Sequence, residues 1–158
     1  MTVDIRRATP EDADVLDAMV RELAGHEGSL AHVHADAAEW RAMLTRPDVR
    51  VLIAEADGEA IGFASTMRRL HMWSAKDILA LDDLYVRSGH RDRGVGGRLM
   101  SAVARLAAQD DLLVVWGVRL DNHAAQRFYG RLGATLSTSM SARWTPESYR
   151  RHLVKSAC

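Results

Sequence analysis

A stretch rich in glycine and arginine has the composition of an anion-binding turn. It reads Arg91-Asp92-Arg93-Gly94-Val95-Gly96-Gly97-Arg98. Glycines let a backbone turn sharply and approach a ligand closely, and free N–H groups at the start of a following helix attract anions such as pyrophosphate. The arginines add charge of the matching sign. A tight strand-to-helix turn with solvated arginines would use the same residues, so composition alone leaves both readings open.

Two familiar phosphate-binding motifs do not fit this stretch. A Walker loop needs Gly-Lys-Ser/Thr, and no lysine follows these glycines. A dinucleotide fingerprint needs a third glycine at position 99, where the chain has Leu99. What remains is an Arg-x-x-Gly-x-Gly pattern that starts at Arg91 and ends at Gly96.

Two adjacent carboxylates stand just before this turn in an otherwise apolar segment, Leu81-Asp82-Asp83-Leu84-Tyr85-Val86. Carboxylates inside an apolar strand are costly to bury unless they are paired or needed for function. Because successive side chains of a strand point to opposite faces, we expect Asp82 and Asp83 not to form a close pair. One is expected to meet a substrate, and the other to pair with an arginine or a backbone donor.

Alternating regular elements must position these residues. Strands are expected over residues 3–8, 49–55, 60–67, 78–86 and 112–118, and residues 134–144 also have strand character. Helices are expected from Pro10 to about Gly25, over 36–44, after the glycines at 94–97, over 122–132, and from Pro146. Asp57-Gly58 is a hairpin turn signal, and the continuous apolar run at 112–118 predicts a strand buried on both faces. The order predicts a mixed α/β or α+β sheet covered by helices.

Length and composition narrow the class of protein. The chain has 158 residues and a mass of 17.5 kDa, which predicts one domain spanning residues 1–158. Lys plus Arg and Asp plus Glu number 21 each, so a broad basic surface for nucleic acid is not expected. No apolar run reaches the roughly 18 residues of a membrane span, and the N-terminus lacks the apolar stretch of a secretory signal. The lone cysteine, Cys158, excludes an intrachain disulfide. We therefore expect a cytoplasmic protein.

The turn and the segment before it together resemble the GNAT acetyltransferase superfamily. A second motif, Asn122-His123-Ala124-Ala125-Gln126-Arg127-Phe128-Tyr129, is similar to that family's Asn-x-x-Ala-x-x-Phe-Tyr helix, and Leu132-Gly133-Ala134 to its exit. The likeness extends to the opening residues 5–12 and covers nearly the whole chain. It implies a GNAT fold with a mostly antiparallel mixed sheet of six to seven strands flanked by about four helices. Within the superfamily, the sequence most resembles the diamine (spermidine/spermine-type) N-acetyltransferases.

The resemblance implies acetyl-CoA as co-substrate and no metal. The residues that would bind acetyl-CoA are Leu84, Tyr85, Val86, Arg91, Asp92, Arg93, Gly94, Val95, Gly96, Gly97, Arg98, Asn122 and Tyr129. Tyr129 stands where the family places the acid that protonates the departing thiolate. On the residues alone, Tyr129 equally fits a core aromatic on one face of its helix, and Asn122 fits a plain helix cap.

Four residues are expected to handle the amine. By the resemblance, Asp82 is the base that deprotonates it, directly or through water, although the diamine enzymes have the longer Glu there. Asp83, Trp73 and Glu27 are further candidates for substrate binding, and Glu27 would serve equally as an ordinary loop acid. The histidines at 26, 32 and 34 do not have the spacing of a metal site, so none is expected.

The segment around Trp73 argues against a polycationic acceptor. Arg68, Arg69 and Lys76 lie nearby, and their charge would repel a polyamine and favour an amine that also carries a carboxylate or phosphonate. Strand alternation sends only one of Arg68 and Arg69 inward. The sequence thus predicts an acetyl-CoA-dependent N-acetyltransferase for a small primary amine: a diamine or polyamine, an amino acid, or an amine-bearing metabolite or antibiotic. The alternatives are a protein or peptide N-acetyltransferase and a non-catalytic CoA-binding regulatory module. A homodimer is expected.

Overall fold

The computed structural model describes residues 1–156. Its contacts divide the chain into two compact units, one from Met1 to Gly117 and one from Val118 onward. Each unit is described by itself below, and the prediction of a single domain stays a prediction. Cys158 lies outside the described residues.

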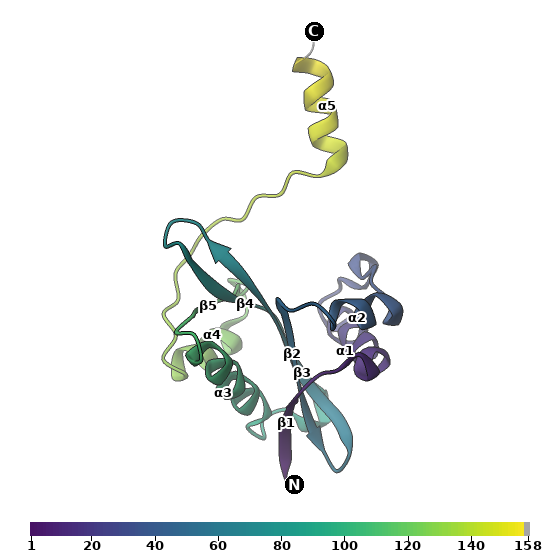
Figure 1. Ribbon diagram of the computed structural model, residues 1–158, viewed down its shortest axis with the longest axis vertical. Coiled ribbons are helices and arrows are strands. Elements are labelled where there is room, and N and C mark those ends of the chain that lie inside the picture. The colour runs from purple at the N-terminus through teal and green to yellow at the C-terminus, as the bar shows by residue number, and fades with distance from the viewer. Residues whose placement is uncertain (157–158) are drawn as a thin grey trace. The chain divides into compact units, whose positions relative to one another are not determined.

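A five-stranded mixed sheet forms the frame of the first unit (Figure 1). The strands are β1 (Val3–Arg7), β2 (Val49–Ala56), β3 (Glu59–His71), β4 (Lys76–Val86) and β5 (Leu113–Val115). They lie in the order β1-β2-β3-β4-β5, antiparallel except for the parallel pair β4–β5. The turn between β2 and β3 is confirmed at Asp57-Gly58, where both residues have positive φ, as a tight hairpin turn requires.

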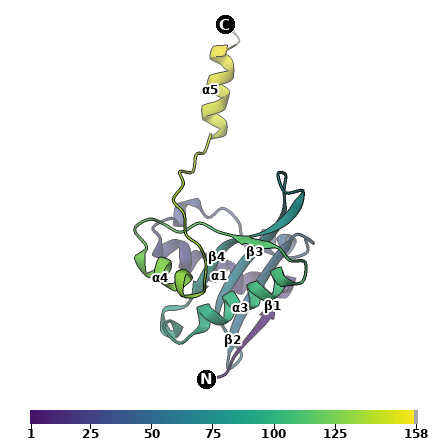
Figure 2. The ribbon, with the colours of Figure 1, turned by 90° about the vertical axis from the view of Figure 1, so that its left-hand side faces the viewer.

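Helices cover both faces of this sheet. The helices are α1 (Ala13–His26), α2 (Ala37–Met43) and α3 (Val95–Ala108). Figures 1 and 2 show α1 and α2 on one face and α3 on the other. The start of α2 shows why a helix begins there: the Asp36 carboxylate accepts from the Glu39 N–H at 3.0 Å, and the Glu39 carboxylate accepts in return from the Asp36 N–H at 2.9 Å.

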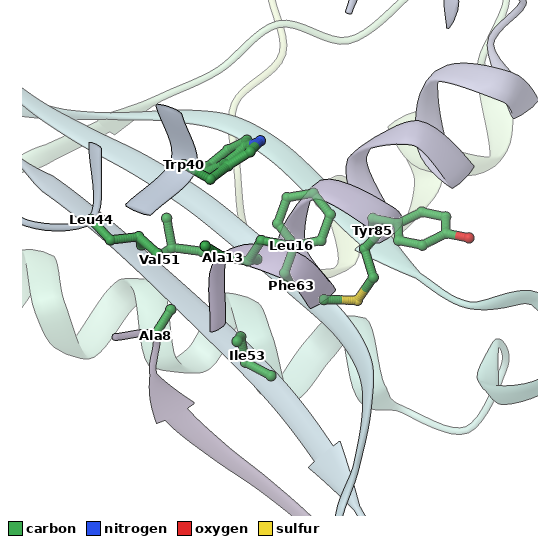
Figure 3. Close-up of a cluster of buried hydrophobic side chains, with 10 residues drawn as sticks. Ala8, Ala13, Leu16, Trp40, Leu44, Val51, Ile53, Phe63 and Tyr85 are labelled. Atoms are coloured by element: carbon green, nitrogen blue, oxygen red, sulfur yellow. The ribbon is translucent and has the colours of Figure 1, made fainter. Parts of the chain in front are cut away.

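The hydrophobic core between α1, α2 and the sheet is drawn in Figure 3. Leu16 and Met19 of α1 are fully buried, and Phe63 and Ile53 of the sheet meet them with 0% exposure. Tyr85 of β4 joins this core, with its ring centroid 6.1 Å from that of Phe63. The C-terminal half of β4 is therefore held by apolar packing on the face that α1 covers.

A polar network joins α1 to the end of β4 beside that core. Arg87 donates from Nε and from a terminal nitrogen to the Glu22 carboxylate at 3.0 and 2.9 Å, and the Tyr85 hydroxyl donates to it at 3.0 Å. Arg87 also donates to the Ala60 carbonyl at 2.8 Å. The hydrogen bonds from Arg87 are the main reason that the pKa of Glu22 is lowered, and Tyr85 adds to the effect. Glu22 thus fixes the chain where β4 leaves the sheet.

The second unit contains two helices, α4 (His123–Arg131) and α5 (Pro146–Ser156). Asn122 caps α4, because its side-chain oxygen accepts from the Ala125 N–H at 3.0 Å. At the start of α5, the Trp144 ring packs against the rings of Tyr149 and His152, with centroids 6.2 and 5.2 Å apart. Among residues 1–156, none of the helices combines the length and apolar character needed to cross a membrane.

Four expectations about the fold were wrong. Among residues 1–156, the sheet has five strands rather than six to seven, and there are five α-helices rather than about four. Residues 134–144 form no strand, because strands exist through hydrogen bonds to a neighbour and no described strand pairs with them. Of the run 112–118, only Leu113–Val115 is strand, and Leu113 is 65% exposed because β5 lies at the sheet edge.

Gly62 allows β3 to approach β4 closely. A Cβ added there would lie 2.6 Å from the carbonyl oxygen of Tyr85 and 3.3 Å from the Cα of Val86, both backbone atoms. We expect Gly62→Ala to lower the free energy of unfolding by about 1–3 kcal/mol, because the strands must separate. Urea unfolding measures the change. Gly25→Ala is the control: the added Cβ meets nothing within 4 Å in helix α1, and this variant should be at least as stable as wild type.

The Glu22–Arg87 contact makes stability depend on pH. Folding lowers the pKa of Glu22, so its contribution is present above the pKa of the unfolded state and is lost as pH falls through the folded value. We expect Glu22→Gln to cost about 0.5–1 kcal/mol at pH 7 and to unfold with a weaker dependence on acid pH than wild type. Urea unfolding between pH 3 and pH 7 measures it. In an Arg87→Gln background, the same substitution at Glu22 should change the pH dependence much less, because the main cause of its lowered pKa is gone. An equal flattening there would contradict the prediction.

Candidate active site

The edge of β4 that faces β5 is open over its C-terminal half. Within the first unit, β5 pairs only with Ile78–Ala80, so residues 81–86 have no strand neighbour on that side. The Arg87 N–H donates to the Ile61 carbonyl of β3 at 2.9 Å. Because N–H groups alternate in direction along a strand, those of Leu84 and Val86 point to the open edge. These main-chain groups can bind an extended ligand.

The turn after β4 leads into an uncapped helix. Asp92 and Gly94 have φ of 59° and 78°, and α3 begins at Val95 without a side-chain hydrogen bond to its first N–H groups. A Cβ on Gly94 or on Gly97 would meet nothing within 4 Å, so the space above this helix start is open. Val95 is 1% exposed and can contribute only main-chain atoms. Free N–H groups at a helix start suit an anion.

The three arginines of the turn have different surroundings. Arg91 donates from Nε to the Val86 carbonyl at 2.8 Å, and its guanidinium lies 5.8 Å from the centre of the Tyr85 ring. Arg91 therefore folds back onto the end of β4 and fixes the turn. Arg98 donates to the Val3 carbonyl of β1 at 3.1 Å, so it also ties α3 to the sheet. Arg93 is exposed in the turn. Open N–H groups with arginines beside them can bind an anion.

A β-bulge in β4 displays Asp82. The register runs from Ser65↔Asp83 to Thr66↔Leu81, so Asp82 is an extra residue without a partner in β3. Ser65 fixes the bulge: its hydroxyl donates to the Asp83 carboxylate at 2.7 Å and accepts from the Asp83 N–H at 3.1 Å. The strict alternation that predicts opposite faces for Asp82 and Asp83 does not hold at this point.

Asp82 has the more unusual carboxyl group of the two. The residue is exposed, but the protein atoms around its carboxyl group remove part of the surrounding water, and this desolvation raises the pKa of Asp82. The nearby charge of Asp83 raises it further, and that of Arg69 lowers it. A carboxylate with a raised pKa is a better proton acceptor at neutral pH.

Arg68 and Arg69 differ in the contacts that their side chains make. Arg68 donates to Asp77 at 2.6 Å and to Asp110, at the end of α3, at 2.5 Å. Arg69 is exposed, and its charge acts on Asp82 instead. Of the two arginines, Arg69 is thus the one associated with the candidate acceptor side.

Two expected substrate contacts lie at the periphery. Trp73 is 97% exposed in the turn between β3 and β4, and Glu27 is exposed at the end of α1. In the part of the chain that the structure describes, no hydrogen bond or ion pair joins either side chain to Asp82 or Asp83. Sequence reasoning gave no role to Glu22, Arg87 or Ser65. A charged residue directly after an apolar strand was the available signal for Arg87.

Tyr129 and Asn122 lie in the second unit. Tyr129 is 9% exposed, and burial raises the pKa of its phenol, which therefore stays protonated at neutral pH. Its ring centroid lies 5.1 Å from that of Phe128. A protonated phenol can donate to a leaving group, but its meeting with Asp82 in one site stays a prediction. No described group of three His, Cys, Asp or Glu side chains could hold a metal ion.

Comparisons with known proteins identify the family of this chain. The model of the acetyltransferase (GNAT) family matches residues 17–134. An uncharacterized N-acetyltransferase of Mycobacterium tuberculosis strain H37Rv is 31% identical over 119 residues, 75% of this chain and 73% of that protein. The aminoalkylphosphonate N-acetyltransferase of Salmonella typhimurium is 28% identical over 131 residues, 82% and 83% of the two chains.

A solved structure shows the same fold. The crystal structure of an aminoglycoside acetyltransferase from an uncultured soil metagenomic sample superposes with a TM-score of 0.79 at 16% identity, covering 92% of this chain and 99% of that one. The family model spans well over half of the chain and includes β4, the turn, α3 and α4. The protein is therefore an N-acetyltransferase that belongs to the acetyltransferase (GNAT) family, in which acetyl-CoA is the co-substrate.

Proposed function

We propose that the protein transfers the acetyl group of acetyl-CoA to a primary amine of a small molecule, by direct attack within a ternary complex. The observation that carries this proposal is the arrangement along one strand. β4 presents Asp82 at a bulge, then the outward N–H groups of Leu84 and Val86, and then the open start of α3. A proton acceptor, main-chain hydrogen-bond donors and an anion site thus follow one another along β4 and into the start of α3.

Asp82 deprotonates the amine, directly or through water. A primary alkylammonium has a pKa near ~10 and cannot attack until it loses a proton. The surroundings that raise the pKa of Asp82 increase its strength as a base, and the nearby charge of Arg69 opposes part of that rise. The shorter Asp, in place of Glu, leaves room for a bridging water.

The N–H groups that point from β4 to its open edge hold the co-substrate and the charge that develops. Acetyl-CoA supplies an acetyl group activated as a thioester. As the amine nitrogen bonds to the acetyl carbon, negative charge grows on the carbonyl oxygen, and a main-chain N–H of the segment Leu84–Val86 stabilises it. Arg91, Arg93 and the first N–H groups of α3 bind the pyrophosphate.

Tyr129 completes the proton balance. The carbon–sulfur bond breaks as the carbon–nitrogen bond forms, and the departing sulfur needs a proton that Tyr129 donates. Its phenol, protonated because burial raises its pKa, is in the required state at neutral pH. The ammonium nitrogen loses two protons in all. Asp82 accepts the first before the attack and releases it to solvent, and the second leaves as the amide forms and replaces the proton that Tyr129 gave to sulfur. One proton is therefore released for each acetyl group transferred.

The relatives favour a small acceptor over a protein. The names of the Salmonella typhimurium relative and of the soil acetyltransferase refer to small amine-bearing molecules. A diamine remains one candidate acceptor within the proposal, and assembly as a homodimer remains a prediction. Release of CoA from acetyl-CoA across a panel of small amines and a few peptides tests the proposal. Turnover of peptides alone would contradict it.

Tyr129→Phe separates binding from catalysis. We expect this variant to bind acetyl-CoA like wild type and to lower kcat by roughly 10²–10⁴, because the ring packing stays and the proton donor is lost. Calorimetric titration with acetyl-CoA and steady-state kinetics measure the two quantities. Gly96→Trp provides the opposite case, since a bulky side chain at the helix start should abolish acetyl-CoA binding. Wild-type turnover by Tyr129→Phe would exclude it as the acid.

Asp82→Asn tests the base through the pH profile. In wild type, kcat/KM should fall as pH falls through the pKa of Asp82, because only the deprotonated carboxylate accepts the proton. Asp82→Asn should lower kcat/KM roughly 10²-fold or more, and its kcat/KM should no longer show this fall at low pH, the acid limb of the profile. In Asp83→Asn the limb should move to lower pH, because the like charge that raises the pKa of Asp82 is gone. An unchanged limb in Asp82→Asn would contradict the assignment.

A further inference from the structure

We propose that the acceptor is an amine that also carries a carboxylate or phosphonate, and that Arg69 is the residue that binds this anion while Asp82 receives the ammonium group. The inference rests on the proposed function and names the substrate class of the same site. It makes Arg69 the residue that determines specificity.

The two neighbouring arginines differ in the partners they already have. Arg68 is held by the carboxylates of Asp77 and Asp110, one on β4 and one at the end of α3. In residues 1–156, no carboxylate oxygen lies within 4 Å of the Arg69 guanidinium. An arginine that already donates to two carboxylates has few N–H groups left for a ligand. An exposed arginine without such partners can donate its N–H groups to an anion.

Strand geometry places Arg69 on the side of the candidate base. Alternate residues of β3 share a face, so Arg69 lies on the same face as Ser65, whose hydroxyl holds Asp83. The register of β3 shows no extra residue between Ser65 and Arg69, because the bulge lies in β4. Arg68 points to the other face, where it forms an ion pair with Asp110, two residues after the end of α3. The bulge and the alternation together set Arg69 and Asp82 toward a common region.

The separation of the two groups suits a small bifunctional molecule. Arg69 lies three residues beyond Thr66, which pairs next to the bulge, a distance of about 10 Å along the strand. The long arginine side chain can shorten that gap, and its charge already acts on Asp82 although the two do not form an ion pair. A molecule with an ammonium at one end and an anion at the other would neutralise both groups. A diamine would instead bring its second cation to Arg69.

Four amines with the same three-carbon chain on the nitrogen test the inference. They are 4-aminobutanoate, 3-aminopropylphosphonate, n-propylamine and 1,3-diaminopropane, each with acetyl-CoA and with CoA release as readout. We expect wild type to show kcat/KM for the two anionic amines at least 10-fold above that for the other two. The two anionic compounds distinguish a carboxylate from a phosphonate preference. All variants carry Cys158→Ser, so that the terminal thiol does not react with the thiol reagent.

Substitutions at Arg69 identify the residue responsible. Arg69→Gln should raise KM for the anionic amines roughly 10-fold and change kcat/KM for n-propylamine far less, because a charge-assisted contact is lost. Arg69→Lys should restore part of the preference, and Arg69→Glu should reverse it toward 1,3-diaminopropane. Arg68→Gln is the matched control on the same strand. It should lose stability in urea unfolding and keep the wild-type preference.

Distinct outcomes overturn the two proposals. Absence of acetylation of every amine by wild type, with acetyl-CoA bound, would contradict the proposed function. Acetylation of all four amines at similar rates, or of 1,3-diaminopropane above the rest, would contradict only the role of Arg69. An equal loss for all amines in Arg69→Gln would assign that residue a structural role and likewise overturn the inference.

Discussion

The unpaired edge of β4 is the constraint on which the rest of the site depends. Backbone N–H and C=O groups in a folded protein need partners, and a sheet normally provides them on both sides of an inner strand. β5 pairs with β4 only at Ile78–Ala80, so the following residues turn their donors outward. The Arg91 side chain takes one outward carbonyl, that of Val86. The remaining groups lie where we place the co-substrate.

The structure holds this edge rigid from the opposite side. Phe63 and the ring of Tyr85 pack together in the core under α1, and Gly62 lets the two strands meet closely. Glu22 and Arg87 then tie the end of β4 to the same helix. A donor that must meet developing charge works best when it does not move, because no energy is then spent on reorganising it. Core packing therefore contributes directly to the proposed chemistry.

Charge in this protein is distributed locally. The chain carries equal numbers of acidic and basic residues, yet opposite charges meet in separate contacts, and a few groups remain apart. Arg68 is neutralised by two carboxylates, while its neighbour Arg69 and the bulged Asp82 are not joined to each other. Two separate, opposite charges of this kind can each attract the opposite charge of a ligand. The net charge of the chain, which is zero, does not reveal this local arrangement.

Local patterns in the sequence determined the family, the glycine turn, the hairpin at Asp57-Gly58 and most of the elements around the site, because caps, glycines and apolar periodicity act over a few residues. Only the tertiary structure decided the number of strands, since the strand-like residues 134–144 pair with no described strand. It also decided how neighbouring residues differ. One extra residue in β4 changes the relative orientation of Asp82 and Asp83. Asp110, 42 positions from Arg68 in the sequence, forms an ion pair with Arg68 and not with Arg69. Such choices depend on contacts between distant segments, which no local pattern records.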